Sequence, residues 1–151
     1  MIICLEGVNC KEKLILADFL QDKTGYGIIY LERQTCECND FDQELRLMIR
    51  WYIICTQNPN AILTYSPYSS CHRFPLLRPH LMYMIQYLPC WHFHIYVKQV
   101  FYEPESTDFF CLSNLITNDI KCIDYHAIFD PSGEGGGVQV ISQFLQDYHF
   151  Q

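Results

Sequence analysis

Charged residues are scarce in this chain, and the positive ones are scattered. Asp, Glu, Lys and Arg make up 18% of the 151 residues, and the formal net charge is −7 at pH 7. A protein that binds the nucleic-acid backbone needs a basic stripe or patch, which the ten Lys and Arg do not form. The sequence therefore argues against a nucleic-acid partner.

Long apolar runs are also missing, because none approaches the roughly 18 residues that a membrane-spanning helix needs. No basic segment precedes the apolar run at Met1–Leu5, so no secretory signal is expected. Nine cysteines form an odd set without a regular framework, and several stand in apolar runs, where a free thiol packs as a small hydrophobe. We expect a soluble protein of the cytoplasm or another reducing intracellular compartment, with no membrane partner.

Aromatic residues, in contrast, are abundant at 15% of the chain. With so few charged side chains available, many Tyr, Phe and Ile atoms must lie at the surface unless a partner covers them. We expect a protein partner or a homodimer. The alternative is a monomer with scattered exposed tyrosines.

Short apolar runs alternate with longer helical patterns, which is typical of successive βα units and a mainly parallel sheet. We predict one α/β domain over residues 1–151 with a five-stranded sheet flanked by helices. The predicted strands are Ile2–Leu5, Gly27–Leu31, Ala61–Tyr65, Trp91–Val100 and Asp124–Phe129. The predicted helices are Lys11–Gln21, Phe41–Cys55, Leu76–Tyr87, a stretch near Asp108–Ile120 and a last one from Gly137 or Val138 to Tyr148.

The helix at Phe41–Cys55 has a clear start signal. Asp40 is placed to cap it, with Gln43 three residues further on. Leu45, Met48, Ile49 and Tyr52 recur at helical spacing, and this pattern predicts their face as the buried one.

The first sixteen residues have the spacing of a phosphate-binding loop without most of its chemistry. Gly7 and Asn9 follow the first apolar run, and Glu12-Lys13-Leu14 stands where the functional pattern has Gly-Lys-Ser or Gly-Lys-Thr. Glu12 places a carboxylate beside the expected anion, and a leucine cannot ligate a metal. Taken alone, these residues also fit an alternative, in which the strand, turn and helix have no role in nucleotide binding.

A second segment makes the pattern more specific. Ala61-Ile-Leu-Thr-Tyr-Ser-Pro-Tyr-Ser-Ser70 resembles the third strand and following turn of the thymidylate kinase and deoxynucleoside kinase group, and Glu6-Gly7-Val8-Asn9 resembles the Glu-Gly-x-Asp of that group. The resemblance implies a three-layer P-loop fold over the whole chain. It also implies a shortened lid region at about residues 101–122.

Compared with the active kinases that it resembles, the chain lacks several charged residues. Thr64 and Tyr65 stand where the active kinases have an acidic residue and an arginine, and no arginine follows Arg78 to serve in the lid. Phosphoryl transfer depends on such charges, and losing one arginine can cost on the order of a thousandfold in rate. We therefore assign no catalytic residue.

Some residues of the chain could still contact a substrate. On the substrate side the candidates are Arg33, Tyr65, Ser66 and Arg73. A surface salt bridge is the alternative role for the two arginines.

The predicted function is that of a catalytically degenerate, kinase-like protein with a structural or protein-interaction role, as in a virus or another fast-diverging genome. No cofactor is expected. Its partner surfaces would be the helices at Phe41–Cys55 and Leu76–Tyr87. The alternative is an active small nucleoside or nucleoside-monophosphate kinase that uses ATP and Mg, with Lys13 at the phosphates and Glu6 or Asp124 as a replacement acid.

A predicted strand also carries three residues of metal-ligating types. Cys90, His92 and His94 alternate along a predicted strand, so their side chains share one face and could converge on zinc. Strand histidines packed among aromatic residues are the alternative, and we expect no metal.

Overall fold

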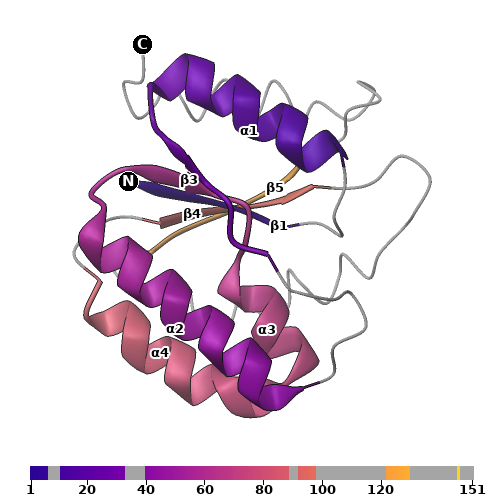
Figure 1. Ribbon diagram of the computed structural model, residues 1–151, viewed down its shortest axis with the longest axis vertical. Coiled ribbons are helices and arrows are strands. Elements are labelled where there is room, and N and C mark those ends of the chain that lie inside the picture. Colours follow the sequence, from indigo (N-terminus) through magenta and orange to yellow (C-terminus); the bar gives the residue numbers. More distant parts are fainter. Residues whose placement is uncertain (7–10, 33–39, 89–91, 98–121, 130–145, 147–151) are drawn as a thin grey trace.

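The computed structural model describes residues 1–6, 11–32, 40–88, 92–97, 122–129 and 146. Helices lie on both faces of a parallel sheet (Figure 1). The strands are β1 (Ile2–Glu6), β2 (Ile28–Ile29), β3 (Ala61–Leu63), β4 (His92–Val97) and β5 (Cys122–Phe129). The helices are α1 (Lys11–Thr24), α2 (Phe41–Gln57), α3 (Pro67–Arg73), the 3-10 turn η1 (Pro75–Leu77) and α4 (Arg78–Gln86). The predicted α/β class with a parallel sheet flanked by helices is confirmed.

The described strands form a 5-stranded sheet in the order β2-β3-β1-β4-β5, and every pairing is parallel. Strand β1 therefore lies at the centre, between β3 and β4. The chain leaves β1 toward β2 on one side, while β4 is followed by β5 on the other side. In open parallel sheets, ligands bind outside the carboxyl ends of the strands at such a reversal of direction.

Helix α1 covers one face of the sheet, and α2, α3 and α4 cover the opposite face (Figure 1). This arrangement follows from right-handed crossovers, because the chain moves in one direction after β1 and in the other after β2 and β3. Side chains alternate along each strand, so Ile3 and Leu5 pack under α1 while Ile2 and Cys4 pack under α2 and α4.

Helix ends match local sequence signals. Asp40 caps α2, and its Oδ1 accepts a hydrogen bond from the backbone N–H of Asp42 at 2.9 Å, as the sequence predicts. At the end of α1, Gly25 adopts a φ of 72° and its N–H donates to the carbonyl of Gln21 at 2.8 Å. A glycine in this left-handed conformation ends a helix without a Cβ clash, so α1 continues to Thr24.

The prediction for the buried face of α2 is only partly right. The buried residues are Glu44, Leu47, Met48, Trp51 and Cys55. Ile49 is exposed, and Tyr52 is only partly buried. The buried stripe is rotated because the large Trp51 ring fills the space beneath the helix, and because the stripe includes the carboxylate of Glu44, which a search for apolar periodicity overlooks.

Helix α3 was not predicted, since the sequence indicated a turn after Tyr65. Pro67 occupies the start of α3, where proline has no hydrogen bond to lose. The predicted helix at Leu76–Tyr87 divides into η1 and α4, with Pro75 and Pro79 near the two starts.

Some predicted elements cannot be compared with the structure. The predicted helix at Asp108–Ile120 and most of the short lid region lie outside the described residues. Of the last predicted helix only Gln146 is described, and it is helical. Within the described part of the chain, no helix is both long and apolar enough to cross a membrane.

Candidate functional site

The candidate site lies at the carboxyl ends of β1 and β3 and beside β4, where buried polar side chains gather. Lys13 stands in the first turn of α1 and is only 3% exposed. A helix N-terminus carries a partial positive charge, so a buried ammonium group at this position is stabilised by a nearby anion. The local chemistry therefore favours a negatively charged group beside the start of α1.

Glu6 ends β1 and is also buried. Its Oε2 accepts a hydrogen bond from the backbone N–H of Ser66 at 3.2 Å. Ser66 precedes the first residue of α3, so the carboxylate lies at the positive end of that helix. This contact joins the ends of β1 and β3.

The hydroxyl of Ser66 continues this connection to β4. Its Oγ lies 2.9 Å from Nδ1 of His94, and both side chains are buried. The ring of Tyr68 packs edge-on against His94, with ring centroids 4.5 Å apart. Glu6, Ser66 and His94 thus form one polar chain across three strands. Because the Ser66 hydroxyl is fully buried, this chain is suited to positioning rather than to nucleophilic attack.

Thr64 and Tyr65 do not replace the charges that an active kinase would carry there. The Oγ1 of Thr64 accepts the N–H of Leu31 at 3.0 Å and thereby ties β3 to the segment after β2. Tyr65 is buried among the residues under α2, and its hydroxyl lies 2.5 Å from Oγ of Ser70. Neither side chain supplies a formal charge at the site.

A second polar group lies between α2 and α3. The Oε2 of Glu44 accepts a hydrogen bond from Ser70 at 2.5 Å, and its Oε1 lies 3.7 Å from Nη1 of Arg73. Nearby, burial raises the pKa of Cys71 to about 12, an effect that Glu44 reinforces and Arg78 opposes. The Cys71 thiol is therefore protonated and unreactive near neutral pH.

The predicted site residues thus have different outcomes. The structure places Lys13 and Ser66 in the buried polar region at the sheet edge, whereas Arg73 forms a salt bridge with the buried carboxylate of Glu44 rather than one at the surface. Glu12 lies in the first turn of α1. Gly7, Asn9 and Arg33 lie outside the described residues.

The histidines of β4 belong to the packed core under α2. The ring centroid of Trp51 lies 5.5 Å from that of His92 and 6.4 Å from that of His94. Cys90 lies outside the described residues, and within the described ones no group of three or more His, Cys, Asp and Glu could hold a metal ion. The core contacts agree with the alternative of histidines packed among aromatic residues.

Sequence reasoning missed Glu44, Ser70 and the role of His94. Glu44 and Ser70 are 26 residues apart, and Ser66 and His94 are 28 apart. The available signal was that Glu44 falls four residues before Met48 and seven before Trp51, on the face that these two bury.

Comparisons with known proteins add information on the fold. No protein-family model matches the chain, and no curated protein has a significantly similar sequence. The crystal structure of YorR from Bacillus subtilis in complex with phosphorylated GDP is similar, with a TM-score of 0.53 and 13% sequence identity. The match covers 100% of this chain and 99% of that one. At this identity it establishes the fold, which this chain shares with a protein solved with a bound nucleotide.

Proposed function

We propose that this protein binds a nucleotide at the carboxyl edge of its sheet and does not transfer the phosphoryl group. The observation that carries the proposal is the burial of Lys13 in the first turn of the helix that follows the central strand. The phosphate groups of a nucleotide are suited to this position, because the backbone N–H groups at the start of a helix bind anions. The fold shared with YorR, which was solved in complex with phosphorylated GDP, also supports nucleotide binding.

The absence of phosphoryl transfer is inferred from the side chains around this position. Thr64 and Tyr65 are engaged in hydrogen bonds within the fold and carry no charge toward a transferring group. Leu14, which follows Lys13, is exposed and cannot bind a magnesium ion. The protein is thus proposed to be a degenerate member of the thymidylate and deoxynucleoside kinase type. An active small kinase using ATP and Mg is the alternative.

Calorimetric titration with GDP, ATP and dTMP, with and without magnesium, tests the proposal. We expect at least one nucleotide to bind with a Kd below about 100 μM, which corresponds to roughly 5 to 6 kcal/mol. Lys13→Ala abolishes this binding. Lys23→Ala is the matched control, because Lys23 is an exposed lysine of the same helix.

The same samples then separate the two alternatives. A coupled assay for ADP formation shows no turnover under the proposal, whereas turnover that requires ATP and magnesium would establish the active kinase. If no nucleotide binds to a folded protein, nucleotide binding itself is rejected.

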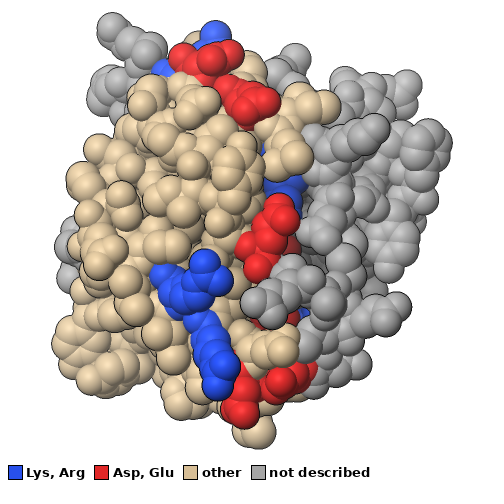
Figure 2. All heavy atoms as spheres, viewed as in Figure 1, with Lys and Arg blue, Asp and Glu red and all other residues tan. Residues whose placement is uncertain are grey.

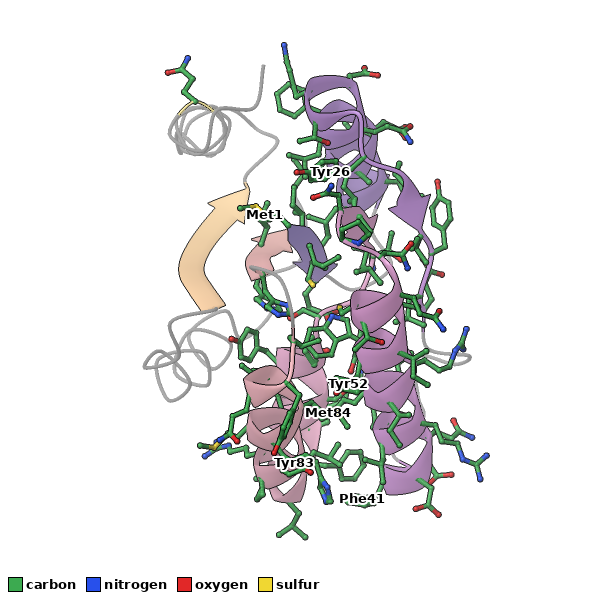
Figure 3. All side chains as sticks on the ribbon, turned by 90° about the vertical axis from the view of Figure 1, so that its left-hand side faces the viewer. Met1, Tyr26, Phe41, Tyr52, Tyr83 and Met84 are labelled. Atoms are coloured by element: carbon green, nitrogen blue, oxygen red, sulfur yellow. The ribbon has the colours of Figure 1, made fainter. Side chains whose placement is uncertain are left out.

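A role in protein interaction is the second part of the proposal, and the surface of α2 and α4 supports it. Ile53 of α2 is 45% exposed, and Tyr83 of α4 is 65% exposed. Ile49, Met82 and Tyr87 are further exposed apolar residues of these two helices or their ends. Figure 2 shows the charged side chains of one face in a band, beside a broad uncharged area. Figure 3 shows Tyr52, Met84 and Phe41 where the helices lie side by side.

Such a surface favours association with a second copy or with another protein. Light scattering after gel filtration measures the molar mass of the wild type and of Tyr83→Lys. We expect an oligomer that Tyr83→Lys dissociates. Ile15→Lys is the control, because Ile15 is exposed on α1 at the opposite face. A monomeric wild type would reject self-association.

A further inference from the structure

The central strand β1 ends in a buried carboxylate, directly before the segment that leads to Lys13. Glu6 is the last residue of β1, and α1, which carries Lys13, is the next element along the chain. Glu6 is 6% exposed and Lys13 is 3% exposed. A carboxylate and a phosphate repel each other, and the repulsion is strong where water is largely excluded. The direction in which Glu6 points therefore affects how tightly an anion binds at the start of α1.

One hydrogen bond directs Glu6 to the face of the sheet opposite α1. Side chains alternate along β1, so Glu6 shares a face with Ile2 and Cys4, which pack under α2 and α4. On this face its Oε2 accepts the backbone N–H of Ser66 at 3.2 Å. Ser66 directly precedes α3, which lies across the sheet from α1 (Figure 1). The position of Ser66 thus sets where this carboxylate oxygen lies.

His94 holds Ser66 from the neighbouring strand β4. Its Nδ1 lies 2.9 Å from Oγ of Ser66, and the register places His94 opposite Cys4 of β1. The imidazole ring packs edge-on against Tyr68 and lies 6.4 Å from the ring of Trp51, measured between centroids. A buried ring enclosed in this way is fixed in one orientation, so its Nδ1 offers Ser66 a fixed partner.

The side chain of Ser66 is not used in the way that is usual for its position. Ser66 is the N-cap residue of α3, where a serine commonly accepts an N–H of the first helical turn. Its side chain makes no capping hydrogen bond within the described part of α3. The hydroxyl is directed to β4 instead, so the contact with His94 aligns Ser66 and the start of α3.

We propose that His94 is a positioning residue of the nucleotide site, which acts through Ser66 to keep the Glu6 carboxylate away from the bound phosphates. The inference rests on the proposed nucleotide binding at the start of α1. When Ser66 loses its partner on β4, its N–H no longer fixes the carboxylate, which then turns toward α1. There its charge opposes the binding of phosphates.

Calorimetric titration of GDP, ATP and dTMP into the wild type and into His94→Leu tests this proposal. Leucine has a similar size and removes the polar ring atoms. We expect nucleotide binding to weaken about tenfold, as for the loss of one buried hydrogen bond. His92→Leu is the matched control, because His92 is equally buried on β4 but lies opposite Ile2, at the far end of β1 from Glu6. We expect this control to leave the Kd unchanged.

Glu6→Gln separates an effect through the Glu6 charge from a general loosening of the fold. Glutamine keeps an oxygen for the N–H of Ser66 and removes the negative charge. In the Glu6→Gln background, His94→Leu should no longer weaken nucleotide binding, because no carboxylate opposes the phosphates. An equal loss in both backgrounds would mean that His94 only supports the fold, and the proposal would be overturned.

Two further variants keep the proposal testable if His94→Leu does not fold. His94→Asn carries an amide at the same distance from the backbone as Nδ1, and it should retain most of the wild-type affinity. Ser66→Ala removes the hydroxyl from the other side of the contact, and it should weaken binding as His94→Leu does.

The titrations also distinguish this inference from the proposed function. If the wild type binds a nucleotide and folded Ser66→Ala binds it equally tightly, the role of His94 is rejected while nucleotide binding stands. If the wild type binds none of the three nucleotides, the proposed function is rejected and the role of His94 with it.

Discussion

The two faces of the sheet are packed in different ways. The fully buried residues of the layer under α1 are aliphatic, namely Ile3, Leu5, Leu16, Ala17, Leu20, Ile62 and Ile95, and the aromatic residues packed against them, Phe19 and Tyr26, are only partly buried. The face under α2, α3 and α4 contains buried aromatic rings, and polar side chains are buried beside them, including Glu44, Ser66, Ser70, His92 and His94. The same strands supply both faces, since their side chains alternate.

This difference shows where the fold can carry specific chemistry. An aliphatic layer stabilises through area removed from water and tolerates changes of shape that keep its volume. A buried polar layer must satisfy its hydrogen bonds, so its members are fixed in one arrangement. The hydrogen-bonded residues Glu6, Ser66 and His94 belong to the polar layer, and so does Glu44 with its contacts to Ser70 and Arg73.

Removing the central ring of the polar face should have the largest effect. Trp51 is fully buried, and its Nε1 lies 3.3 Å from Sγ of Cys4. We expect Trp51→Ala to lower the free energy of unfolding by about 3–5 kcal/mol, since it leaves a large cavity. Leu16→Ala on the aliphatic face should cost about 2–5 kcal/mol by the same principle and serves as the comparison. Urea denaturation measures both variants. If Trp51→Ala lowers the free energy of unfolding less than Leu16→Ala does, the polar face is not the more sensitive of the two.

Breaking one hydrogen bond of the polar layer should cost less. Ser66→Ala removes the hydroxyl from Nδ1 of His94 while it leaves the backbone N–H that binds Glu6. We expect a loss of about 1–3 kcal/mol in the free energy of unfolding. Ser69→Ala is the control, because the Ser69 hydroxyl donates to the carbonyl of Ser66 in its own turn and is partly exposed. If both variants lose the same free energy of unfolding, the buried hydrogen bond of Ser66 contributes no more than the exposed one of Ser69.

Raising the pH should destabilise the polar face through Cys71. The pKa of this thiol is about 12 in the folded protein against an ordinary 9.0, mainly because it is buried. Between these values the unfolded chain loses the proton first, so the free energy of unfolding falls as the pH rises, by up to about 1.4 kcal/mol per pH unit. Urea denaturation at pH 8 to 10.5 should show a shallower fall for Cys71→Ala. Parallel curves would mean that the thiol does not contribute.

The smallest effect concerns the start of α2, which presents Glu44 to the polar layer. Asp40→Ala removes the side chain that accepts the N–H of Asp42, and we expect a cost of about 1 kcal/mol. Asp40→Asn keeps the acceptor and should restore most of this loss. Thermal unfolding followed by circular dichroism measures both variants. If Asp40→Asn is as unstable as Asp40→Ala, the contribution of Asp40 is its charge rather than the cap.

Much of the fold could be predicted because its signals are local. The alternation of short apolar runs with helical patterns predicted β1, β3 and the first two helices near their observed bounds. The cap at Asp40 is equally local, because the residues that form it lie two positions apart. Helix α3 was missed since its seven residues carry no apolar stripe long enough to recognise.

The candidate site was predictable only where it follows a sequence motif. The spacing after Gly7 singled out Lys13, and the structure adds that this side chain is buried. Tyr65 was expected on the substrate side, yet it points into the core, because it shares its strand face with Leu63 and the rings under α2. The sequence motif identified the segment that contains Tyr65, but the direction of its side chain depends on how that segment packs in the sheet.

The sequence by itself determined the parallel βα class, most strands, the first two helices and the scarcity of charge, with Arg73 and Arg78 as the only charged residues between Arg50 and Lys98. Only the tertiary structure decided the strand order, the partners of Glu44 and the meeting of Glu6 with Ser66. Glu6 and Ser66 are 60 residues apart. Such contacts depend on how parallel strands from distant segments align at one sheet edge, and no local pattern of residues contains that information.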